Sequence, residues 1–304
     1  MEKKFLFTIF LPIIVIIAYT LIFHINPESI VLKINPYFVV VFFLFYFLQI
    51  GLLAYRDSKI SGLPISITYK ARLFANGVGL IIPGALGPDL ARAIFYVKGK
   101  RMGLDKAFSI SLYESFYDVV VLSVLFLILI WFHFSPVELI LVLTALGNII
   151  LWIGGIGYVY GTSHKSLNRI ENIIFSIKYI KPLQNAYLNG KGAIKSRMSN
   201  PVLTTLSLIL TALAYIIQSI PFYLLFNSFF FSILVNTTYQ VSLLVPIPSA
   251  AGVAELALTA LLPPLLVVQI RILELVSFAF GLIYIKDIKL SELKDEVKAV
   301  WRTT

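Results

Sequence analysis

Long apolar runs alternate along the chain with short polar connections. Crossing the hydrocarbon layer of a membrane as a helix takes about 20 residues. The first run follows the polar start MEKK and is longer than a signal-peptide core, so it is interpreted as a membrane anchor. The pattern predicts six spanning helices, at residues 5–23, 37–55, 108–132, 137–160, 201–226 and 265–285.

Basic residues orient these helices, because connections rich in Lys and Arg stay on the cytoplasmic side of a membrane. The connections 24–36, 133–136 and 227–230 together hold one basic residue, whereas the two termini and the other connections hold 22 of the 25. Only Arg92 and Arg271 then remain inside apolar segments. The distribution predicts a multi-pass protein of the cell membrane with both termini in the cytoplasm.

Two further apolar regions, residues 73–97 and 229–264, are interrupted by Pro, Gly and polar residues. The first lies between two basic connections, so its chain must enter and leave on the cytoplasmic side. The second must leave and return on the outer side. Two such re-entrant hairpins of opposite orientation are typical of the inverted repeats of transporters.

The predicted fold class is therefore all-α: a polytopic helical bundle with six spanning helices and two opposed re-entrant hairpins. The whole chain, residues 1–304, is interpreted as one transmembrane domain. Within it, apolar residues at helical spacing among Lys and Arg predict an amphipathic linker at about 161–200 on the inner membrane surface. Residues 286–304 form a basic cytoplasmic tail.

Composition agrees with this interpretation. The chain is 59% hydrophobic and 13% charged, with a mean hydropathy of +0.91, whereas roughly a quarter of residues are charged in globular proteins. No stretch remains for a sizeable soluble catalytic domain. The net charge of +10 fits an anionic membrane surface and requires no nucleic acid. With no cysteine and three isolated histidines, we expect neither a metal site nor a cofactor.

The first hairpin contains the stretch LIIPGALGPDLARAIF, in which Pro83, Gly84 and Gly87 with Pro88 predict a break. Non-helical backbone at membrane depth is tolerated only inside protein or along a wet cavity. A helix starting just after Pro88 would direct free N–H groups into that cavity, with Asp89 in its first turn and Arg92 nearby. This arrangement suits a charged headgroup.

The second hairpin contains the matching stretch VPIPSAAGVAELALTALL. Pro246 and Pro248 break the backbone, small residues from Ser249 to Gly252 allow close approach, and Glu255 lies on the helix that follows. Four polar residues in a stretch of five precede this break and are expected to line a cavity: Asn236, Thr237, Thr238 and Gln240.

Ions within membrane segments are expensive and are candidates for function by default. For the two arginines a functional role and a structural one both stay open. Asp89 with Arg92, and Arg271 with Glu274, stand three residues apart, so each pair could simply neutralise itself within one helix. Glu114 and Asp118 share a helix face and are expected to face a cation, water or a common proton. Glu255 has no charged neighbour in sequence, so its partner must come from elsewhere in the fold or from a ligand.

These motifs resemble a known family, the transmembrane region of lysylphosphatidylglycerol synthases, a flippase-like domain also found in multiple peptide resistance factor and in stand-alone membrane proteins. Its first motif, an Asn before Pro-Gly, Gly-Gly-Asp and Arg, is similar to Asn76, Pro83-Gly84, Gly87-Pro88-Asp89 and Arg92. Its second motif, Pro-x-Pro-Gly-Gly-x-Gly-x-x-Glu, is similar to the stretch from Pro246 to Glu255. A late arginine of the family resembles Arg271, with Gly281 beyond it.

The chain also departs from the family pattern. Pro88, Ser249 and Ala250 stand where the family has glycines, and these exchanges between small residues are expected to be mild. Ser115 stands where the family usually has an arginine three residues before Asp118. We expect this change to make the cavity less positive.

The resemblance and the charges together predict a protein that moves a charged phospholipid or lipid-linked glycan headgroup between leaflets. Arg92 and Arg271 would hold phosphate, while Asp89, Glu114, Asp118 and Glu255 would balance charge, bind an amine or carry protons. No ATP-binding motif is present, so an uphill step would have to use an ion gradient or a partner. The outer connections are short with few acids, so we expect no enzymatic activity. Two alternatives stay open: a membrane glycosyl- or phosphotransferase acting on a lipid-linked substrate, and a non-transporting assembly subunit. A homo-oligomer or a biosynthetic partner enzyme also stays open.

Overall fold

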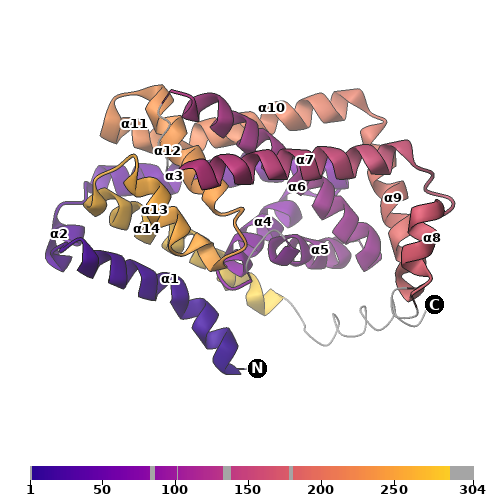
Figure 1. Ribbon diagram of the computed structural model, residues 1–304, viewed down its shortest axis with the longest axis horizontal. Coiled ribbons are helices and arrows are strands. Elements are labelled where there is room, and N and C mark those ends of the chain that lie inside the picture. Colours follow the sequence, from indigo (N-terminus) through magenta and orange to yellow (C-terminus); the bar gives the residue numbers. More distant parts are fainter. Residues whose placement is uncertain (1, 83–85, 101, 133–137, 178–180, 288–304) are drawn as a thin grey trace.

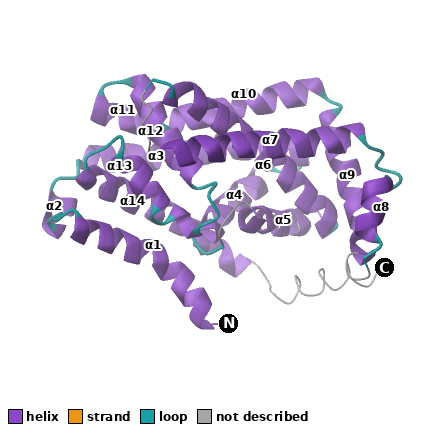
Figure 2. Cartoon of the chain, viewed as in Figure 1, coloured by secondary structure: helices purple, strands orange, loops and turns teal. Residues whose placement is uncertain are grey.

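The computed structural model describes residues 2–82, 86–100, 102–132, 138–177 and 181–287 (Figure 1). These residues form helices joined by loops, and no strand occurs among them (Figure 2). The sequence prediction of an all-helical membrane protein is thus confirmed for the described part of the chain.

Five helical segments in the described residues are long and apolar enough to cross a membrane, and they match five of the six predicted spans. Three of these segments are single helices, and two consist of two consecutive helices each. The five are α3 (Pro36–Ser61), α6 (Leu104–Ile130), α7 (Leu139–Gly161), α10 (Pro201–Gln218) with α11 (Ile220–Phe226), and α14 (Pro264–Ala279) with η4 (Phe280–Asp287).

The sixth predicted span, residues 5–23, corresponds to α1 (Glu2–Ile22), which is followed by the short α2 (Pro27–Leu32). The apolar part of α1 that the structure describes in detail, Phe10–Ile22, is shorter than a full crossing. The sixth span therefore stays a prediction.

Helix α3 corrects one predicted boundary. Its start follows from Asn35, whose side chain accepts a hydrogen bond from the backbone N–H of Tyr37. The predicted end at residue 55 is wrong, because the helix continues through Arg56 and Asp57 to Ser61. It ends at Gly62, which adopts the left-handed conformation (φ 70°) that glycine favours at helix ends.

Each predicted hairpin region consists of short helices that pack on each other. The first contains α4 (Ile65–Gly79) and α5 (Leu86–Lys100), and the second contains α12 (Phe229–Ser242), η3 (Pro248–Ala250) and α13 (Val253–Thr259). A helix of 15 residues is about 22 Å long, less than the hydrocarbon thickness of about 30 Å. These lengths suit half-crossings, while the inverted repeat stays a prediction.

The break of the first hairpin differs slightly from the prediction. Helix α5 begins at Leu86 rather than after Pro88, because a proline in the first turn costs no hydrogen bond within the helix. Asp89 lies in this first turn, as expected. Pro83 and Gly84 fall outside the described residues.

The predicted linker forms α8 (Arg169–Phe175), η2 (Lys181–Leu183) and α9 (Gln184–Met198) at one end of the molecule, opposite α2 and α11 (Figure 1). Ile170 and Ile173 on α8 are exposed, whereas Glu171 is buried. Hydrogen bonds from Lys191, Tyr187 and Tyr158 reach Glu171, so that carboxylate joins α8 to α9 and to the end of α7. The tail beyond residue 287 lies outside the described residues.

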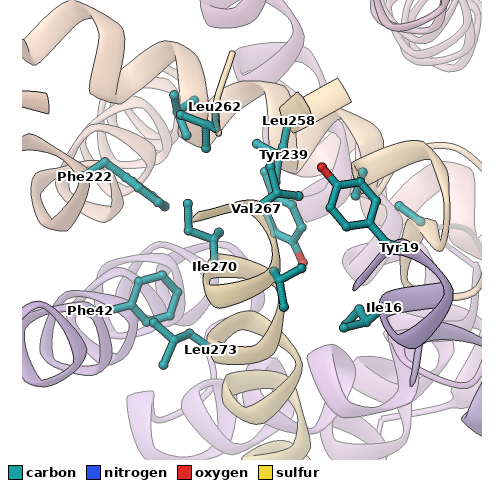
Figure 3. Close-up of a cluster of buried hydrophobic side chains, with 14 of the residues drawn as sticks. Ile16, Tyr19, Phe42, Phe222, Tyr239, Leu258, Leu262, Val267, Ile270 and Leu273 are labelled. Carbon is teal, nitrogen blue, oxygen red and sulfur yellow. The ribbon is translucent and has the colours of Figure 1, made fainter. Parts of the chain in front are cut away.

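A large apolar core joins the second hairpin to the helices on either side of it in sequence, and to α1 and α3 (Figure 3). Between apolar helices in lipid, close packing rather than dehydration provides the stabilisation. The buried members labelled in Figure 3 are Ile16, Tyr19, Phe42, Phe222, Tyr239, Leu258, Leu262, Val267, Ile270 and Leu273.

Helix α4 approaches η4 so closely that only glycine fits at two facing positions. A Cβ atom added to Gly281 would lie 1.7 Å from the carbonyl oxygen of Leu73, and one added to Gly77 would lie 2.9 Å from the backbone nitrogen of Leu282. The two segments therefore meet backbone to backbone.

Candidate functional site

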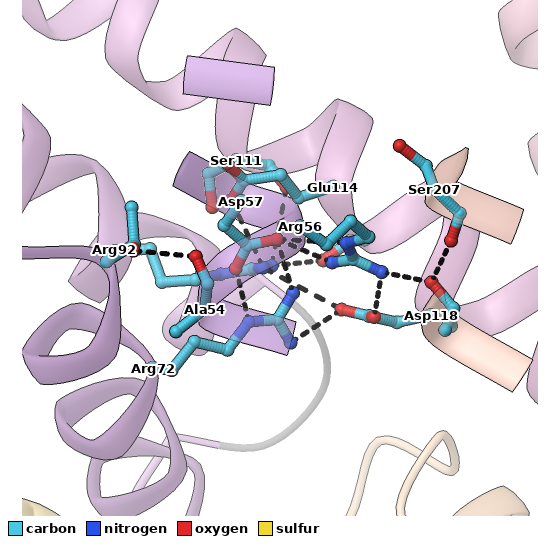
Figure 4. A network of polar contacts seen from close by, with 12 residues as sticks. Ala54, Arg56, Asp57, Arg72, Arg92, Ser111, Glu114, Asp118 and Ser207 are labelled. Atoms are coloured by element: carbon cyan, nitrogen blue, oxygen red, sulfur yellow. Dashed lines mark hydrogen bonds and ion pairs between the residues drawn. The ribbon is translucent and has the colours of Figure 1, made fainter. Parts of the chain in front are cut away.

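Two arginines and two aspartates from three helices interlock at the centre of the site (Figure 4). Arg56 on α3 donates to Asp57 Oδ1 at 2.7 Å and to Asp118 Oδ1 at 2.7 Å. Arg72 on α4 donates to the other oxygen of Asp57 and, at 2.8 Å, to Asp118 Oδ2. Each aspartate is thus bound by both arginines, which offsets the cost of burying the four charges.

Helix α5 adds a third arginine to this arrangement. Arg92 pairs with Asp89 one turn earlier, donates to the hydroxyl of Ser115 and reaches Glu114 Oε2 at 3.4 Å. Tyr96 donates to the same oxygen of Glu114 at 2.7 Å. We refer to the seven ions as the first charge cluster: Arg56, Asp57, Arg72, Asp89, Arg92, Glu114 and Asp118.

A smaller cluster lies at the second hairpin. Arg271 on α14 donates to Glu255 at 2.8 Å, to the Tyr239 hydroxyl at 2.9 Å and to the carbonyl oxygen of Ser249 at 2.8 Å. The sequence left the partner of Glu255 open, and it is Arg271. Glu274 is buried beside them, with Arg271 and Tyr239 as its electrostatic neighbours. We refer to Tyr239, Glu255, Arg271 and Glu274 as the second charge cluster.

The backbone of the second break is strained. Ser249 and Ala250 have φ angles of 50° and 52°, in the left-handed region that side chains other than glycine rarely adopt, and Gly252 has φ 87°. Such residues cost roughly 1–3 kcal/mol each. The expectation that Ser249 and Ala250 are mild exchanges for glycine is therefore wrong, because both positions have a conformation that favours glycine.

A cavity of about 150 Å³ lies between the two hairpins. Both hairpins contribute to its wall, together with α3, α10 and α14. Its polar lining residues are Gln49, Arg72, Asn76, Tyr215, Gln240 and Ser249.

The structure separates the expected site residues into two groups. Asn76 and Ser249 line the cavity, and Asn76 also donates to the Tyr46 hydroxyl at 3.0 Å. The expected ions do not line it and lie in the two charge clusters behind its wall: Asp89, Arg92, Glu114, Asp118, Glu255 and Arg271.

Three glycine and proline positions act on the backbone rather than through a side chain. A Cβ atom at Gly87 would lie 2.6 Å from the Ile82 side chain, so glycine allows the first turn of α5 to approach Ile82 closely. Pro248 opens the 3₁₀ turn of the second break, preceded by the exposed Pro246. The backbone N–H of Gly252 donates to Glu255 Oε2 at 2.7 Å and fixes that carboxylate.

Sequence reasoning missed Arg56, Asp57 and Arg72. They were assigned to a basic connection, so the statement that only Arg92 and Arg271 lie inside apolar segments is wrong: the Arg56 and Asp57 side chains are fully buried. A usable signal was present, because Gly62 followed by Pro64 predicts a helix end there and would have placed Arg56 and Asp57 inside α3.

Other expectations are partly met. Gln240 lines the cavity as expected, whereas Asn236 is buried and donates to the Tyr215 carbonyl oxygen. Despite Ser115 in place of the usual family arginine, Asp118 has three guanidinium groups within 4 Å. Among the described residues no group of three or more acidic or histidine side chains is arranged to hold a metal ion.

Comparison with known proteins adds the family. Neither the curated proteins nor the solved structures that were compared contain a match to this chain. The family model of the lysylphosphatidylglycerol synthase transmembrane region, however, matches residues 9–280. The match covers both hairpins, both charge clusters and the cavity between them. The chain therefore belongs to the lysylphosphatidylglycerol synthase transmembrane region family.

Proposed function

We propose that this protein moves a lipid with a phosphate-bearing headgroup between the two leaflets of a membrane. The observation that carries the proposal is the cavity between the hairpins. Its wall contains Arg72 and five other polar side chains, and five apolar spans occur in the described part of the chain. A polar cavity between apolar helices suits a headgroup that must pass through hydrocarbon.

Arg72 is the cation of the proposed headgroup site. It is the charged member of the cavity lining, and its guanidinium is already held by Asp57 and Asp118. Guanidinium groups bind phosphate oxygens strongly and with defined geometry. In this proposal Arg92 and Arg271 act from behind the wall: Arg92 holds the first charge cluster together, and Arg271 fixes the carbonyl oxygen of Ser249.

The proposal includes the arrangement in the membrane. The first hairpin enters from the cytoplasmic side and the second from the outer side, so the two halves form an inverted repeat with α1 as the sixth span. Cysteines introduced singly at Lys59, Lys98 and Ser228 test this, because the chain has no cysteine of its own. Residues 59 and 98 should be labelled from the inside and residue 228 from the outside. Labelling of 59 and 98 from opposite sides would refute the hairpin.

Transport is tested with purified protein in vesicles that contain a fluorescent phosphate-bearing lipid, without nucleotide or sugar donor. A charge-assisted hydrogen bond contributes roughly 1.5–3 kcal/mol, so Arg72→Gln should slow leaflet exchange about ten- to a hundred-fold. Lys70→Gln is the control, since Lys70 is exposed on the same helix and lies outside the cavity wall. Equal rates in both variants would contradict the role of Arg72.

A second variant separates loss of binding from loss of folding. Asn76→Leu leaves the charge of the site unchanged but replaces a polar group of the cavity wall by an apolar one. It should slow exchange while leaving the elution volume in size-exclusion chromatography unchanged. Formation of a new glycolipid that requires a sugar donor, without leaflet exchange, would favour a transferase instead.

A further inference from the structure

The first charge cluster has more acids than bases. Its four carboxyl groups and three guanidinium groups would carry a net charge of −1 if all were ionised. Six of the seven side chains are less than 10% exposed, and Asp118 is 14% exposed. An uncompensated charge at such a place is costly, and binding of one proton removes it.

The four carboxyl groups differ in how well they are neutralised. Asp57 and Asp118 accept hydrogen bonds from arginines on both oxygens. Asp89 accepts on one oxygen from Arg92 and, at 2.6 Å, from the Ser115 hydroxyl. Their negative charges are therefore stabilised by short bonds to arginine.

Glu114 is the least compensated of the four. Arg92 reaches it only at 3.4 Å, and its one short hydrogen bond comes from the neutral hydroxyl of Tyr96. Its other oxygen, Oε1, is buried and has no hydrogen-bond partner, which is also true of Asp89 Oδ2, so the two groups differ in the short arginine bond that Glu114 lacks. Of the four carboxyl groups, Glu114 is therefore the one that binds a proton at the lowest cost in free energy.

The groups around Glu114 come from several helices. Like charges on Asp57, Asp89 and Asp118 oppose its ionisation, and the arginines favour it. The charged and titratable neighbours are Arg56 and Asp57 on α3, Arg72 on α4, Asp89, Arg92 and Tyr96 on α5, Asp118 on α6, Arg197 on α9, and Tyr215 on α10 facing Asp118.

We infer that Glu114 holds an exchangeable proton and that a phosphate-bearing headgroup binds at Arg72 only together with this proton. The proposal rests on the proposed function and adds its coupling ion. With the proton on Glu114 the cluster is neutral, and an anion in the cavity meets no excess negative charge behind Arg72. Loss of the proton to water leaves the cluster at −1, which repels the anion.

Arg72 provides the physical link between the two events. Its guanidinium lines the cavity and also binds Asp57 and Asp118, so a phosphate there competes with those carboxylates for the same cation. By linkage, anion and proton then favour each other's binding by the same factor. A proton gradient could drive the lipid across the membrane without nucleotide.

The proton itself is tested without any lipid transport. The infrared spectrum of the purified protein in phosphatidylcholine vesicles should contain a C=O component from the buried protonated carboxyl group of Glu114, and Glu114→Gln should remove that component. Glu274 can contribute a separate component, because both of its carboxyl oxygens are buried without a hydrogen-bond partner. Glu274→Gln is the control from the second charge cluster and should keep the component that Glu114→Gln removes. Asp89→Asn leaves three carboxyl and three guanidinium groups in the first charge cluster, so it should release the proton of Glu114 and lose the same component. Absence of that component in the unaltered protein, or its persistence in Glu114→Gln, would overturn the inference.

The coupling is tested with phosphatidylglycerol that has a fluorescent acyl chain, in phosphatidylcholine vesicles, because its phosphodiester headgroup does not itself titrate near neutral pH. For one proton, the apparent affinity should fall about tenfold per pH unit above the midpoint. Glu114→Gln should abolish this pH dependence. Tyr96→Phe removes the short hydrogen bond to the carboxylate, should move the midpoint to higher pH, and serves if Glu114→Gln does not fold.

The outcomes separate the two proposals. Leaflet exchange that does not change with pH, or that keeps its pH dependence in Glu114→Gln, refutes the coupling and leaves the proposed function intact. A lipid that does not move at any pH, with the infrared component of Glu114 present, refutes the proposed function while the proton site on Glu114 remains.

Discussion

Both charge clusters neutralise buried carboxylates, but the carboxylates of the two clusters have different numbers of partners. In the first, each of Asp57 and Asp118 is bound by two arginines, and each of those arginines binds both aspartates. In the second, Glu255 has one cationic partner, Arg271, and one backbone N–H.

This difference predicts how each region responds to the loss of one ion. A network can redistribute its contacts when one member is removed, whereas a single pair leaves a buried charge without a counterion. The first cluster should therefore tolerate change and suit a site whose charges move during a cycle. The second should behave as a fixed brace for the strained break beside it.

The largest effect is expected for Arg271→Met. It leaves the buried carboxylate of Glu255 with one backbone N–H, and breaking a buried pair in this way costs about 3–5 kcal/mol. The unfolding free energy in mixed detergent micelles measures the loss. Adding Glu255→Gln should recover most of it, and a double variant no more stable than the single one would contradict the pairwise description.

Arg56→Met should cost less, about 2 kcal/mol, although its guanidinium is fully buried too. Arg72 keeps both Asp57 and Asp118 in contact with a positive charge, which limits the loss. The same unfolding measurement applies, with Lys59→Met as a control at an exposed position of the same helix. A cost equal to that of Arg271→Met would remove the distinction between network and pair.

Ser249→Gly should stabilise the protein by about 1 kcal/mol. Glycine adopts the left-handed conformation at low cost, and the change removes a buried hydroxyl that has no hydrogen-bond partner. Ser242→Gly is the opposite control, because Ser242 is helical and its hydroxyl donates to the Tyr239 carbonyl oxygen. If both changes destabilised the protein equally, the strain at Ser249 would not be real.

The smallest effect is expected for the ion pair between Glu171 and Lys191, which lies outside the spanning helices. Burial alone would raise the pKa of Glu171, but hydrogen bonds from Lys191, Tyr187, Asn168 and Tyr158 lower it to about 2. Its contribution is therefore complete above the ordinary pKa near 4.5 and is lost as the pH falls towards 2.

Hydrogen exchange of α8 and α9 should accordingly quicken between pH 4.5 and 2, after correction for the intrinsic pH dependence of exchange. Glu171→Gln should show the faster exchange already at neutral pH. Protection that is independent of pH in the unaltered protein would show that this contact contributes little to local stability.

The sequence was most informative where apolar runs are long and uninterrupted. Five spans, the interruptions at both hairpins and the charged residues behind the breaks all follow from local pattern. Pro246, Pro248 and Glu255 could be placed together because they are close in sequence.

Contacts between distant residues could not be predicted in this way. Arg56 and Asp57 look like the start of a polar connection, since their counterions Arg72 and Asp118 stand 15 to 62 residues away. The partner of Glu255 likewise required the fold. Burial of an ion depends on its partners in space, and hydropathy along the chain does not contain that information.

The backbone contact between Gly77 and Gly281 has a consequence for motion. Two segments that touch without side chains between them cannot slide or tilt apart without losing their contact entirely. Helix α4, with Arg72, and the α14–η4 span, with Arg271, are thereby joined near the cavity. We expect them to move as one rigid unit, so that any opening of the cavity takes place against α3, α10 and α12 on its other side.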